Sequence, residues 1–376
     1  MRILVLTKRQ YMGKDLLDDR FGRFRELPLE LSRMGHTVKG LTLSYRNRAE
    51  GSFTDLAESS DAAITWHSVN LLNGLRPGLG KYIRRVHKVV EDFRPEIIWA
   101  CSDAYHAIFG YQLAKKSQTK CVIDLYDNFE AFNASKIPGV VALFKKAVQK
   151  ADGVTCFSAR LADYTIRAYP RLLPTAVIEN GVRTDLFYPR DRVNCRQSLG
   201  LPEKAKIIGT AGALDSSRGI ETLFRAFEML AAEDSQLHLA IAGPRGRGLR
   251  VPNGARAHDL QTLAHDKVGS FINALNLAVV CYRDSAQGRY SFPQKAYEIL
   301  ACGVPMVAAA VGSMNDLLKP YPAALFEPEN PASLVSAIRF QLEHSARMEI
   351  EVPTWRQSAE RLESFFQRIA RERTGA

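Results

Sequence analysis

The feature that most restricts the fold is a regular alternation of short apolar runs with amphipathic stretches. Apolar runs of three to six residues indicate buried strands, whereas apolar residues spaced three and four apart indicate helices. Strands that alternate with helices predict an α/β domain with a parallel sheet. In the first half we expect strands at 3–6, 38–43, 97–100, 121–125 and 154–156, and helices at 21–34, 81–93, 104–115 and 140–150.

The alternation starts again after residue 180, where the turn-forming pair Asn180-Gly181 follows an apolar run. The chain of 376 residues is long enough for two domains at about 150 residues each. We therefore expect domains at 1–180 and 181–350 and a C-terminal helical segment at 351–376. In the second half the expected strands are 207–210, 237–242, 277–281 and 305–309, and the expected helices are 220–232, 293–301, 331–342 and 354–371.

The composition is that of an ordinary globular protein, with 46% apolar and 24% charged residues. No apolar run approaches the roughly 20 residues that a membrane-spanning helix needs. The opening run at 3–6 is too short for a signal-peptide core and indicates a first strand. The six cysteines are scattered and form no C-x-x-C pair, so we expect free thiols and a cytoplasmic protein.

The net charge of +11 suits nucleic acid, an anionic membrane or a phosphorylated substrate. Part of it lies between residues 62 and 90, where no acid occurs and apolar residues such as Trp66, Leu72, Leu79 and Tyr82 stand among basic ones. A basic helix beside exposed apolar residues is typical of a protein that lies on an anionic membrane; an ordinary amphipathic helix with a solvated basic face is the alternative. No nucleic-acid readout motif is present, so nucleic acid is not expected as a partner. The basic residues of this surface are Arg76, Lys81, Arg84, Arg85 and Lys88.

The segment 290–309 carries the most chemical information. Pro293 favours the start of a helix, on which Ser291, Lys295 and Glu298 share one face. A helix N-terminus offers unpaired N–H groups to a diphosphate, and a carboxylate further along can bind two ribose hydroxyls. Lysine in the first turn opposes the helix dipole, so a bound anion would account for it. The alternative is a capped surface helix with one Lys–Glu pair.

Two further patterns concern the charge of the ligand. Arg245, Arg247 and Arg250 stand among glycines after the strand at 237–242, as either a loop that closes over a diphosphate or a solvated loop. No D-x-D triplet is present to hold Mg²⁺ or Mn²⁺, so we expect no metal, with cationic side chains and helix dipoles in its place. No G-x-G-x-x-G follows the first strand, which argues against a dinucleotide-dependent oxidoreductase.

The segment 290–309 resembles the signature of retaining glycosyltransferases of the GT-B fold in family 4. Glu298, Ala301, Gly303, Pro305 and Val307 occupy the places of that motif. The resemblance extends over most of the chain, in the expected order, through residues 178–182 with 187–189, residues 208–212 with 218–220, the strand at 239–243, Gly312 with Asp316, and Trp355.

The resemblance implies two Rossmann-like domains that face a central cleft, with a C-terminal helix that crosses back to the first domain. It implies transfer of a hexose-type sugar from a nucleotide-diphosphate sugar, UDP being favoured over GDP, with retention and without metal or other cofactor. The first domain would take a lipid-linked or polysaccharide acceptor in envelope glycan synthesis. The protein would then be cytoplasmic and peripheral at the inner face of the membrane.

The resemblance also assigns roles to single residues. Glu298 would hold the ribose, Arg218 and Lys295 would meet the diphosphate, and Asp127 would be the polar group nearest the reacting carbon, with His106 as the alternative. Either Asp127 or His106 could instead be a simple strand-end cap. The expected donor-binding residues are Gly13, Gly212, Arg218, Gly243, Arg245, Tyr290, Ser291, Phe292, Lys295 and Glu298, and the expected catalytic residues are Asp127, His106, Arg218 and Lys295.

Four positions depart from the family pattern. Tyr290 replaces the first acid of the usual E-x7-E pair, which contacts the sugar, so the sugar cannot be inferred. Ala213 stands where an arginine is common, Tyr126 where a histidine is common, and Asn276 where an aspartate is common. Two alternatives therefore stay open, namely an epimerase or phosphorylase of the same fold, and a degenerate GT-B module that binds without catalysis.

Overall fold

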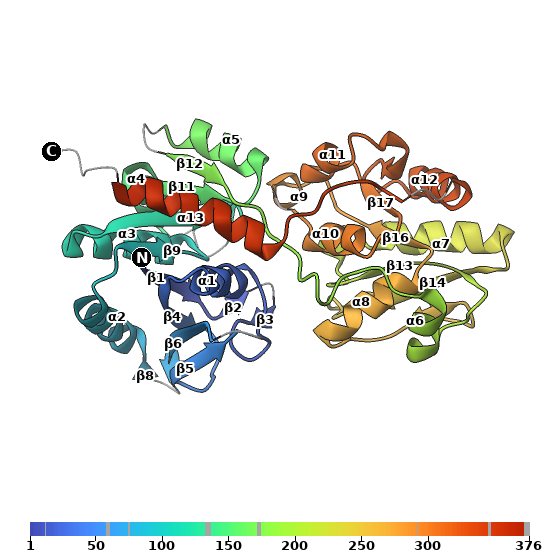
Figure 1. The fold of residues 1–376 in the computed structure, drawn as a ribbon. Helices are drawn as coiled ribbons and strands as arrows, with labels where there is room; N and C mark the ends of the chain where they lie inside the picture. The colour runs from blue at the N-terminus through green and yellow to red at the C-terminus, as the bar shows by residue number, and fades with distance from the viewer. Residues whose placement is uncertain are drawn as a thin grey trace. The chain divides into compact units, whose positions relative to one another are not determined.

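The computed structural model describes residues 1–11, 13–57, 61–73, 76–131, 137–170, 174–290, 292–344 and 347–371 (Figure 1). Contacts divide the chain into two compact units. Unit 1 consists of Met1–Asn180 together with Trp355–Ala376, and unit 2 consists of Gly181–Thr354. The C-terminal helix thus belongs to unit 1, although the segment before it, up to Thr354, belongs to unit 2.

Unit 1 is built on a sheet of order β12-β11-β10-β9-β1-β4-β6-β5. Every neighbouring pair is parallel except β5 and β6, which are antiparallel. The chain order reverses between β1 and β9, and the carboxyl ends of strands at such a switch point are where α/β sheets bind ligands. The strands are β1 Arg2–Lys8, β4 Thr37–Ser44, β5 Gly51–Leu56, β6 Ala63–Asn70, β9 Ile97–Ala100, β10 Lys120–Leu125, β11 Gly153–Cys156 and β12 Thr175–Val177.

Helices cover this sheet, and α1 is buried on nearly all sides, including its charged residues Arg23 and Glu26. The C-terminal helix α13 packs on α1, and its Phe366 ring lies 5.9 Å from the ring of Trp99 in β9. A short hairpin, β2 Gln10–Tyr11 with β3 Lys14–Asp15, follows β1 directly, and a second joins β7 Leu72–Asn73 to β8 Arg76–Pro77. The helices are α1 Arg23–Arg33, α2 Leu79–Phe93, α3 Ala104–Ser117, α4 Val140–Lys150, α5 Ala159–Ala168 and α13 Trp355–Arg371, with a 3-10 turn at Phe129–Ala131.

Unit 2 repeats the plan with a parallel sheet of order β15-β14-β13-β16-β17-β18. Its switch point lies between β13 and β16. The strands are β13 Lys206–Ala211, β14 Leu237–Ala242, β15 Ala257–Asp259, β16 Leu277–Val280, β17 Met306–Ala309 and β18 Leu325–Phe326. The helices are α6 Arg192–Leu199, α7 Glu221–Glu233, α8 His265–Ala274, α9 Ala286–Tyr290, α10 Gln294–Ala301, α11 Ser313–Leu317 and α12 Pro331–Glu343, with 3-10 turns η3 Ser216–Arg218 and η4 Pro322–Ala324.

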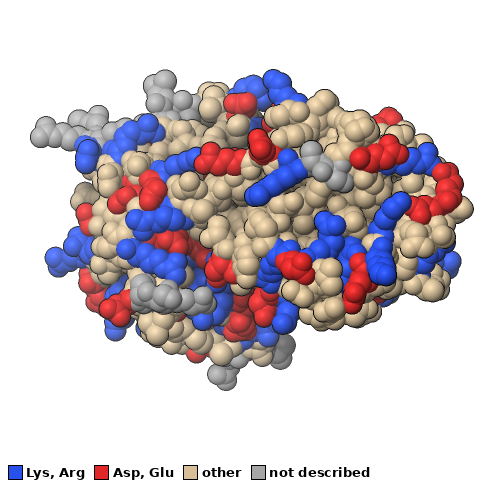
Figure 2. All heavy atoms as spheres, turned by 45° about the vertical axis from the view of Figure 1, so that its right-hand side comes forward, with Lys and Arg blue, Asp and Glu red and all other residues tan. Residues whose placement is uncertain are grey.

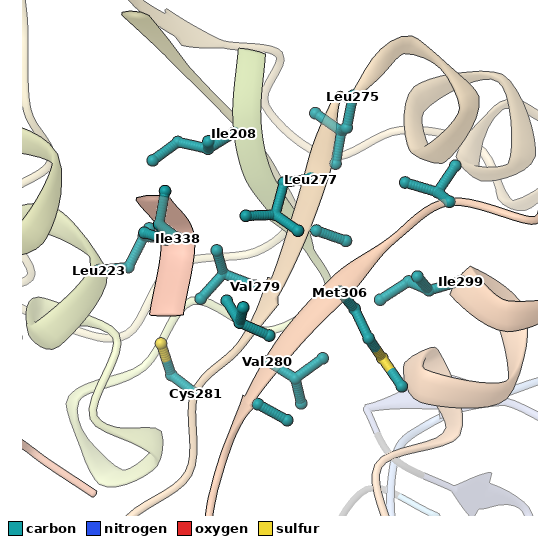
Figure 3. Close-up of a cluster of buried hydrophobic side chains, with 14 of the residues drawn as sticks. Ile208, Leu223, Leu275, Leu277, Val279, Val280, Cys281, Ile299, Met306 and Ile338 are labelled. Carbon is teal, nitrogen blue, oxygen red and sulfur yellow. The ribbon is translucent and has the colours of Figure 1, made fainter. Parts of the chain in front are cut away.

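The core of unit 2 fixes the position of its switch point. Val279 and Val280 alternate across β16, so one faces Leu223 and Ile338 of α7 and α12 while the other faces Ile299 of α10 (Figure 3). These side chains are buried on both faces, as expected for a parallel sheet covered by helices. The packing of α10 against β16 places its first turn beside the carboxyl ends of the strands.

Candidate functional site

Two glycines form the floor of the switch point in unit 2. Gly212 follows β13 and Gly243 follows β14, and the Gly212 amide donates to the Ala242 carbonyl over 2.9 Å. A Cβ atom at Gly243, whose φ is +138°, would lie 1.9 Å from the carbonyl oxygen of Gly212. Only glycine permits this approach of the two loops. The result is a shared backbone surface at the ends of these two strands.

Lys295 of α10 lies on this surface. Its Nζ donates to Oγ1 of Thr210 over 3.3 Å, and a Cβ atom at Gly212 would lie 3.4 Å from Nζ. The glycine thus leaves space beside the amine that any larger residue would fill. The first turn of α10 and the end of β13 therefore present one ammonium group to the same space.

A second cation and a carboxylate complete the group. Arg218 of η3 donates from Nη1 to the Tyr282 hydroxyl over 2.8 Å. Burial, together with the nearby Arg218, lowers the pKa of Lys295 to about 8. Burial raises the pKa of Glu298 to about 7, against the opposing effect of Lys295. Two neighbouring cations with a single carboxylate favour a site for an added anion.

The other predicted donor-binding residues of unit 2 lie nearby with varied contacts. Arg245 forms an ion pair with Asp259 of β15, so its charge is already balanced. Tyr290 ends α9, and the Phe292 ring lies 4.4 Å from the Tyr297 ring. Ser291 lies outside the described residues.

The switch point of unit 1 carries a different set of groups. The Lys8 amide at the end of β1 donates to Oγ of Ser102, just beyond β9, over 2.8 Å. The Lys8 amine donates to the hydroxyl of Tyr126, just beyond β10, over 3.0 Å. Ser102 is buried with φ of +82°, a strained conformation for serine that persists where the surroundings hold it. Three adjacent strand ends are thus joined by polar contacts.

His106 and Asp103 form a pair beside these strand ends. Asp103 caps α3: its Oδ1 accepts from the His106 amide over 2.9 Å and lies 2.8 Å from Nδ1 of the same residue. Burial opposes ionisation of Asp103, but His106 outweighs it and holds the pKa at about 2. Nε2 of His106 is buried and has no hydrogen-bond partner among the described residues. The imidazole therefore points into unit 1 and supports Asp103, which sequence reasoning did not consider.

Asp127 and Gly13 take more open positions. Asp127 is partly exposed after β10, and its Oδ1 accepts from the Asn128 amide over 2.8 Å. Gly13 is exposed in the turn between β2 and β3 with φ of +81°. Asp127 thus follows β10 and Gly13 lies beyond β1 in the β2–β3 turn, and their roles stay predictions.

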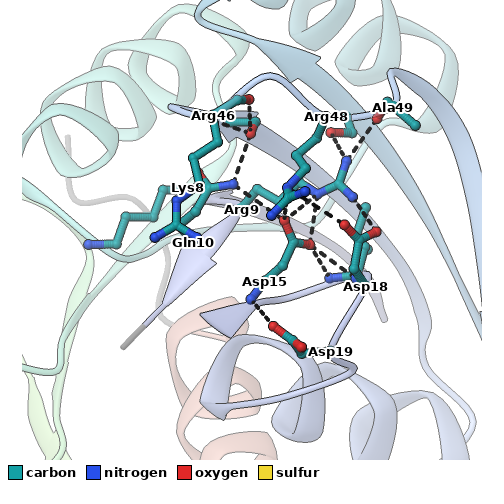
Figure 4. Close-up of polar contacts among 12 residues, drawn as sticks. Lys8, Arg9, Gln10, Asp15, Asp18, Asp19, Arg46, Arg48 and Ala49 are labelled. Atoms are coloured by element: carbon teal, nitrogen blue, oxygen red, sulfur yellow. Dashed lines mark hydrogen bonds and ion pairs between the residues drawn. The ribbon is translucent and has the colours of Figure 1, made fainter. Parts of the chain in front are cut away.

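A buried ion network that sequence reasoning missed fixes the loop after β1. Arg9 is fully buried and donates from Nε to Asp15 over 2.8 Å and from Nη2 to Asp18 over 2.6 Å (Figure 4). Its Nη1 donates to the carbonyl of Ala49 over 2.8 Å, and Asp15 also accepts from the backbone of Leu17. Arg9, which precedes the β2–β3 hairpin, thus binds residues that follow its turn, and these contacts fix the hairpin that carries Gly13. The run of charges at 8–20 was the available signal.

The basic surface on α2 is partly as expected. Lys81, Arg84, Arg85 and Lys88 are exposed, and Arg76 stands in β8. Lys81 pairs with Glu50 over 2.6 Å. Elsewhere on the molecule basic and acidic side chains are interspersed over the face shown in Figure 2.

The apolar part of that expectation is partly wrong. Leu72 and Leu79 are exposed, at 60% and 47%, but Trp66 and Tyr82 are buried. Trp66 fills the space over Gly40, where a Cβ atom would lie 2.0 Å from the indole. The aromatic residues therefore stabilise the core and do not extend the surface.

Neither a metal cluster nor a spanning helix is found in the part of the chain that the structure describes. There, no group of three or more His, Cys, Asp or Glu side chains could hold a metal ion. No described helix is long and apolar enough to cross a membrane. The six cysteines are buried and free.

Comparison with protein families identifies both units. Residues 23–181 match the model described as glycosyl transferase 4-like domain, and residues 191–352 match the model of glycosyl transferases group 1. The chain belongs to this family of glycosyltransferases. The two matches together span most of both units.

Individual relatives are more distant. D-inositol 3-phosphate glycosyltransferase 1 of Catenulispora acidiphila is 29% identical over 236 residues, which are 57% of this chain and 55% of that protein. The chain therefore matches only about half the length of this relative. Sucrose-phosphate synthase from Thermosynechococcus elongatus has a TM-score of 0.73 and 20% identity, with 98% of this chain and 96% of that chain covered. Anabaena Alr3699/HepE in complex with UDP has a TM-score of 0.69 and 18% identity, with 99% and 98% covered. These structures show the same GT-B fold.

Proposed function

We propose that the protein transfers a hexose from UDP-hexose to a hydroxyl group of a lipid-linked or polysaccharide acceptor in envelope glycan synthesis, with retention and without a metal ion. The observation that carries this proposal is the group formed by Gly212, Lys295, Arg218 and Glu298 at the switch point of unit 2. It combines open backbone, two cations and one carboxylate at the edge where parallel sheets bind nucleotides. The structure of the relative solved with UDP supports the choice of base.

The residues of unit 2 would act on the departing diphosphate. Lys295 and Arg218 would stabilise its developing charge, which removes the need for a divalent cation. Glu298 would accept hydrogen bonds from the two ribose hydroxyls. The acceptor oxygen bonds to the anomeric carbon as the bond from that carbon to the phosphate oxygen breaks on the same face. The acceptor proton passes to the departing phosphate, so positioning does most of the work.

Unit 1 would bind the acceptor. Asp127, which is partly exposed at the end of β10, is the group that would orient an acceptor hydroxyl. His106 would act through Asp103, because its own Nε2 is enclosed. The exposed basic residues of α2 with Leu72 and Leu79 would hold the protein peripherally at an anionic membrane from the cytoplasmic side.

The first experiment screens UDP-, GDP-, dTDP- and ADP-sugars by thermal shift on the full chain. Incubation with each donor and EDTA, followed by mass spectrometry, then identifies released nucleotide. We expect UDP-hexose to stabilise the protein and release UDP with EDTA present. Loss of release on adding EDTA contradicts the metal-free proposal, and an epimerised donor without released UDP favours an epimerase. Weak binding of every nucleotide favours a non-catalytic module, which Tyr290 in place of the usual acid leaves open.

A matched pair of variants tests the site itself. Glu298→Gln should lower UDP-hexose affinity about tenfold, since a charge-assisted hydrogen bond becomes a neutral one. Glu228→Gln, on the exposed face of α7, should leave it unchanged. Equal UDP-hexose affinities in the two variants would show that Glu298 does not bind the donor.

A further inference from the structure

The switch point of unit 1 contains both signs of charge, in contrast to the surplus of cations in unit 2. Burial lowers the pKa of the partly buried Lys8 amine, whereas the nearby Asp103 and Asp127 raise it. Asp103 is also paired with His106 over 2.8 Å. Lys8 and Asp127 are then left in balance, so this group has no surplus positive charge to neutralise a phosphate dianion.

The neighbouring arginines do not supply such a surplus. Arg9, next to Lys8, is fully buried and bonded to Asp15 and Asp18. Arg23 is fully buried and bonded through two nitrogens to Asp124, at 2.7 and 2.9 Å. The Lys8 side chain extends away from the Arg9–Asp15 contacts (Figure 4), so its amine is separate from that ion network.

Two exposed aromatic rings border the same strand ends. Tyr45, which follows β4, is 45% exposed while its hydroxyl donates to Oδ2 of Asp103 over 3.0 Å. Tyr105, in the first turn of α3, is 37% exposed. Partly exposed tyrosines provide flat, amphipathic surfaces for a ring-shaped ligand. Carboxylate, ammonium and phenol groups beside them match the hydroxyl groups of such a ring.

We propose that the switch point of unit 1 binds an uncharged, hydroxyl-rich ring, namely a sugar residue without phosphate, and that Lys8, Asp127, Tyr126 and Tyr45 determine this choice. The inference rests on the proposed function, which it deepens by giving the acceptor class. Lys8 and Asp127 hydrogen-bond acceptor hydroxyls, and Tyr45 covers one face of the ring. Tyr126 positions Lys8 through the 3.0 Å contact.

The test compares acceptors that differ in a phosphate. Wild-type protein is incubated with UDP-hexose and one acceptor at a time. The neutral acceptors are methyl glucoside, methyl mannoside and methyl galactoside. The phosphorylated acceptors are glucose 6-phosphate, mannose 6-phosphate and galactose 6-phosphate. We expect kcat/KM for the best neutral acceptor to exceed that for the best phosphorylated one at least tenfold. Preference for a phosphorylated acceptor, or transfer to neither series, overturns the inference. UDP affinity, measured separately by calorimetry, reports on the proposed function, because it depends on unit 2.

Variants show whether these residues make the choice. Lys8→Met should raise the acceptor KM at least tenfold with UDP affinity unchanged, and Tyr126→Phe should give a smaller rise. Lys39→Met is the matched control: Lys39 is also a partly buried lysine of this sheet, with Nζ 4.8 Å from the centre of the Phe93 ring, and its replacement should leave KM unchanged.

Substitutions that change the charge of Asp127 test recognition of the acceptor separately from folding. Asp127→Asn and Asp127→Lys should shift the ratio of kcat/KM progressively toward phosphorylated acceptors, a change that mere loss of structure would not produce. An unchanged ratio in both variants, with wild-type thermal stability, overturns the role of Asp127.

Discussion

The two switch points have the same architecture but differ in their balance of charge. In each unit the strand order reverses between two adjacent parallel strands, and loops, a helix start and a lysine meet at the carboxyl ends. In unit 1 the arginines nearest the switch point are buried against carboxylates, and Lys8 stands between Asp103 and Asp127. In unit 2 Lys295 and Arg218 bond only to hydroxyl groups in the contacts described, with Glu298 nearby. The difference teaches that charge balance, rather than fold, separates the proposed diphosphate site of unit 2 from the proposed sugar site of unit 1.

The largest expected effect comes from breaking the internal balance of unit 1. Arg23→Met leaves Asp124 buried without its cation, which costs about 3–5 kcal/mol in free energy of unfolding. Urea denaturation followed by circular dichroism measures it. Arg20→Met is the control, because Arg20 is half exposed beside Asp55 and its pair contributes less than about 1 kcal/mol. Similar losses in the two variants would show that burial of the pair is not what matters.

Removing a cation from unit 2 should act on ligand binding instead of stability. Lys295→Met should weaken UDP binding about a hundredfold, since charge-assisted bonds to a phosphate contribute about 1.5–3 kcal/mol each. The free energy of unfolding should change little, because the ammonium has only Thr210 as a described hydrogen-bond partner and its removal also leaves Glu298 without a neighbouring cation. Calorimetry and urea denaturation measure the two quantities. The control Lys267→Met alters an exposed lysine of α8 and should change neither; a drop in stability without a change in UDP affinity would make Lys295 structural.

The glycine floor of unit 2 gives a smaller effect. Gly243→Ala places a Cβ atom against the Gly212 carbonyl, which forces the two loops apart and should weaken UDP binding about tenfold. Gly248→Ala has a positive φ of 77° but no atom within 4 Å, so it tests strain alone and should cost about 1 kcal/mol of stability without altering UDP affinity. Equal UDP affinities in the two variants would show that close approach of the loops is not needed.

Much of the fold follows from periodicity alone. The run at 140–150 is helix α4 with those bounds, and the runs at 237–242 and 97–100 are β14 and β9. The antiparallel edge strand β5 escaped, because its half-exposed sequence lacks an apolar run. Helix α6 escaped too: its sequence is polar, and only Cys195 and Arg196 are buried. These two elements bury few side chains and so leave little periodic signal. Strand β6 and helix α8 were also not predicted, although both bury several side chains.

The residues of the candidate site also fall into those that the sequence can predict and those that it cannot. Lys295, Glu298 and Gly212 could be found from spacing and motif, because one helix and one loop determine their positions. Lys8 could not, because its role depends on Ser102 and Tyr126, which lie 94 and 118 residues away. The Arg9 ion network could not be predicted for the same reason, since a charge run in the sequence does not show which arginine is buried. Contacts that join distant strands need the topology first.

The smallest effect concerns protonation of Lys295. Its pKa is about 8 in the free protein, and a bound diphosphate favours the charged amine, so binding raises that pKa. UDP affinity should therefore fall up to tenfold per unit above pH 8, with proton uptake on binding near pH 8.5. Calorimetry in two buffers of different ionisation enthalpy measures the uptake. Lys295→Arg keeps its charge throughout this range and should remove both the fall and the uptake. A similar fall in that variant would assign the titration to another group and leave the cation surplus of unit 2 independent of Lys295.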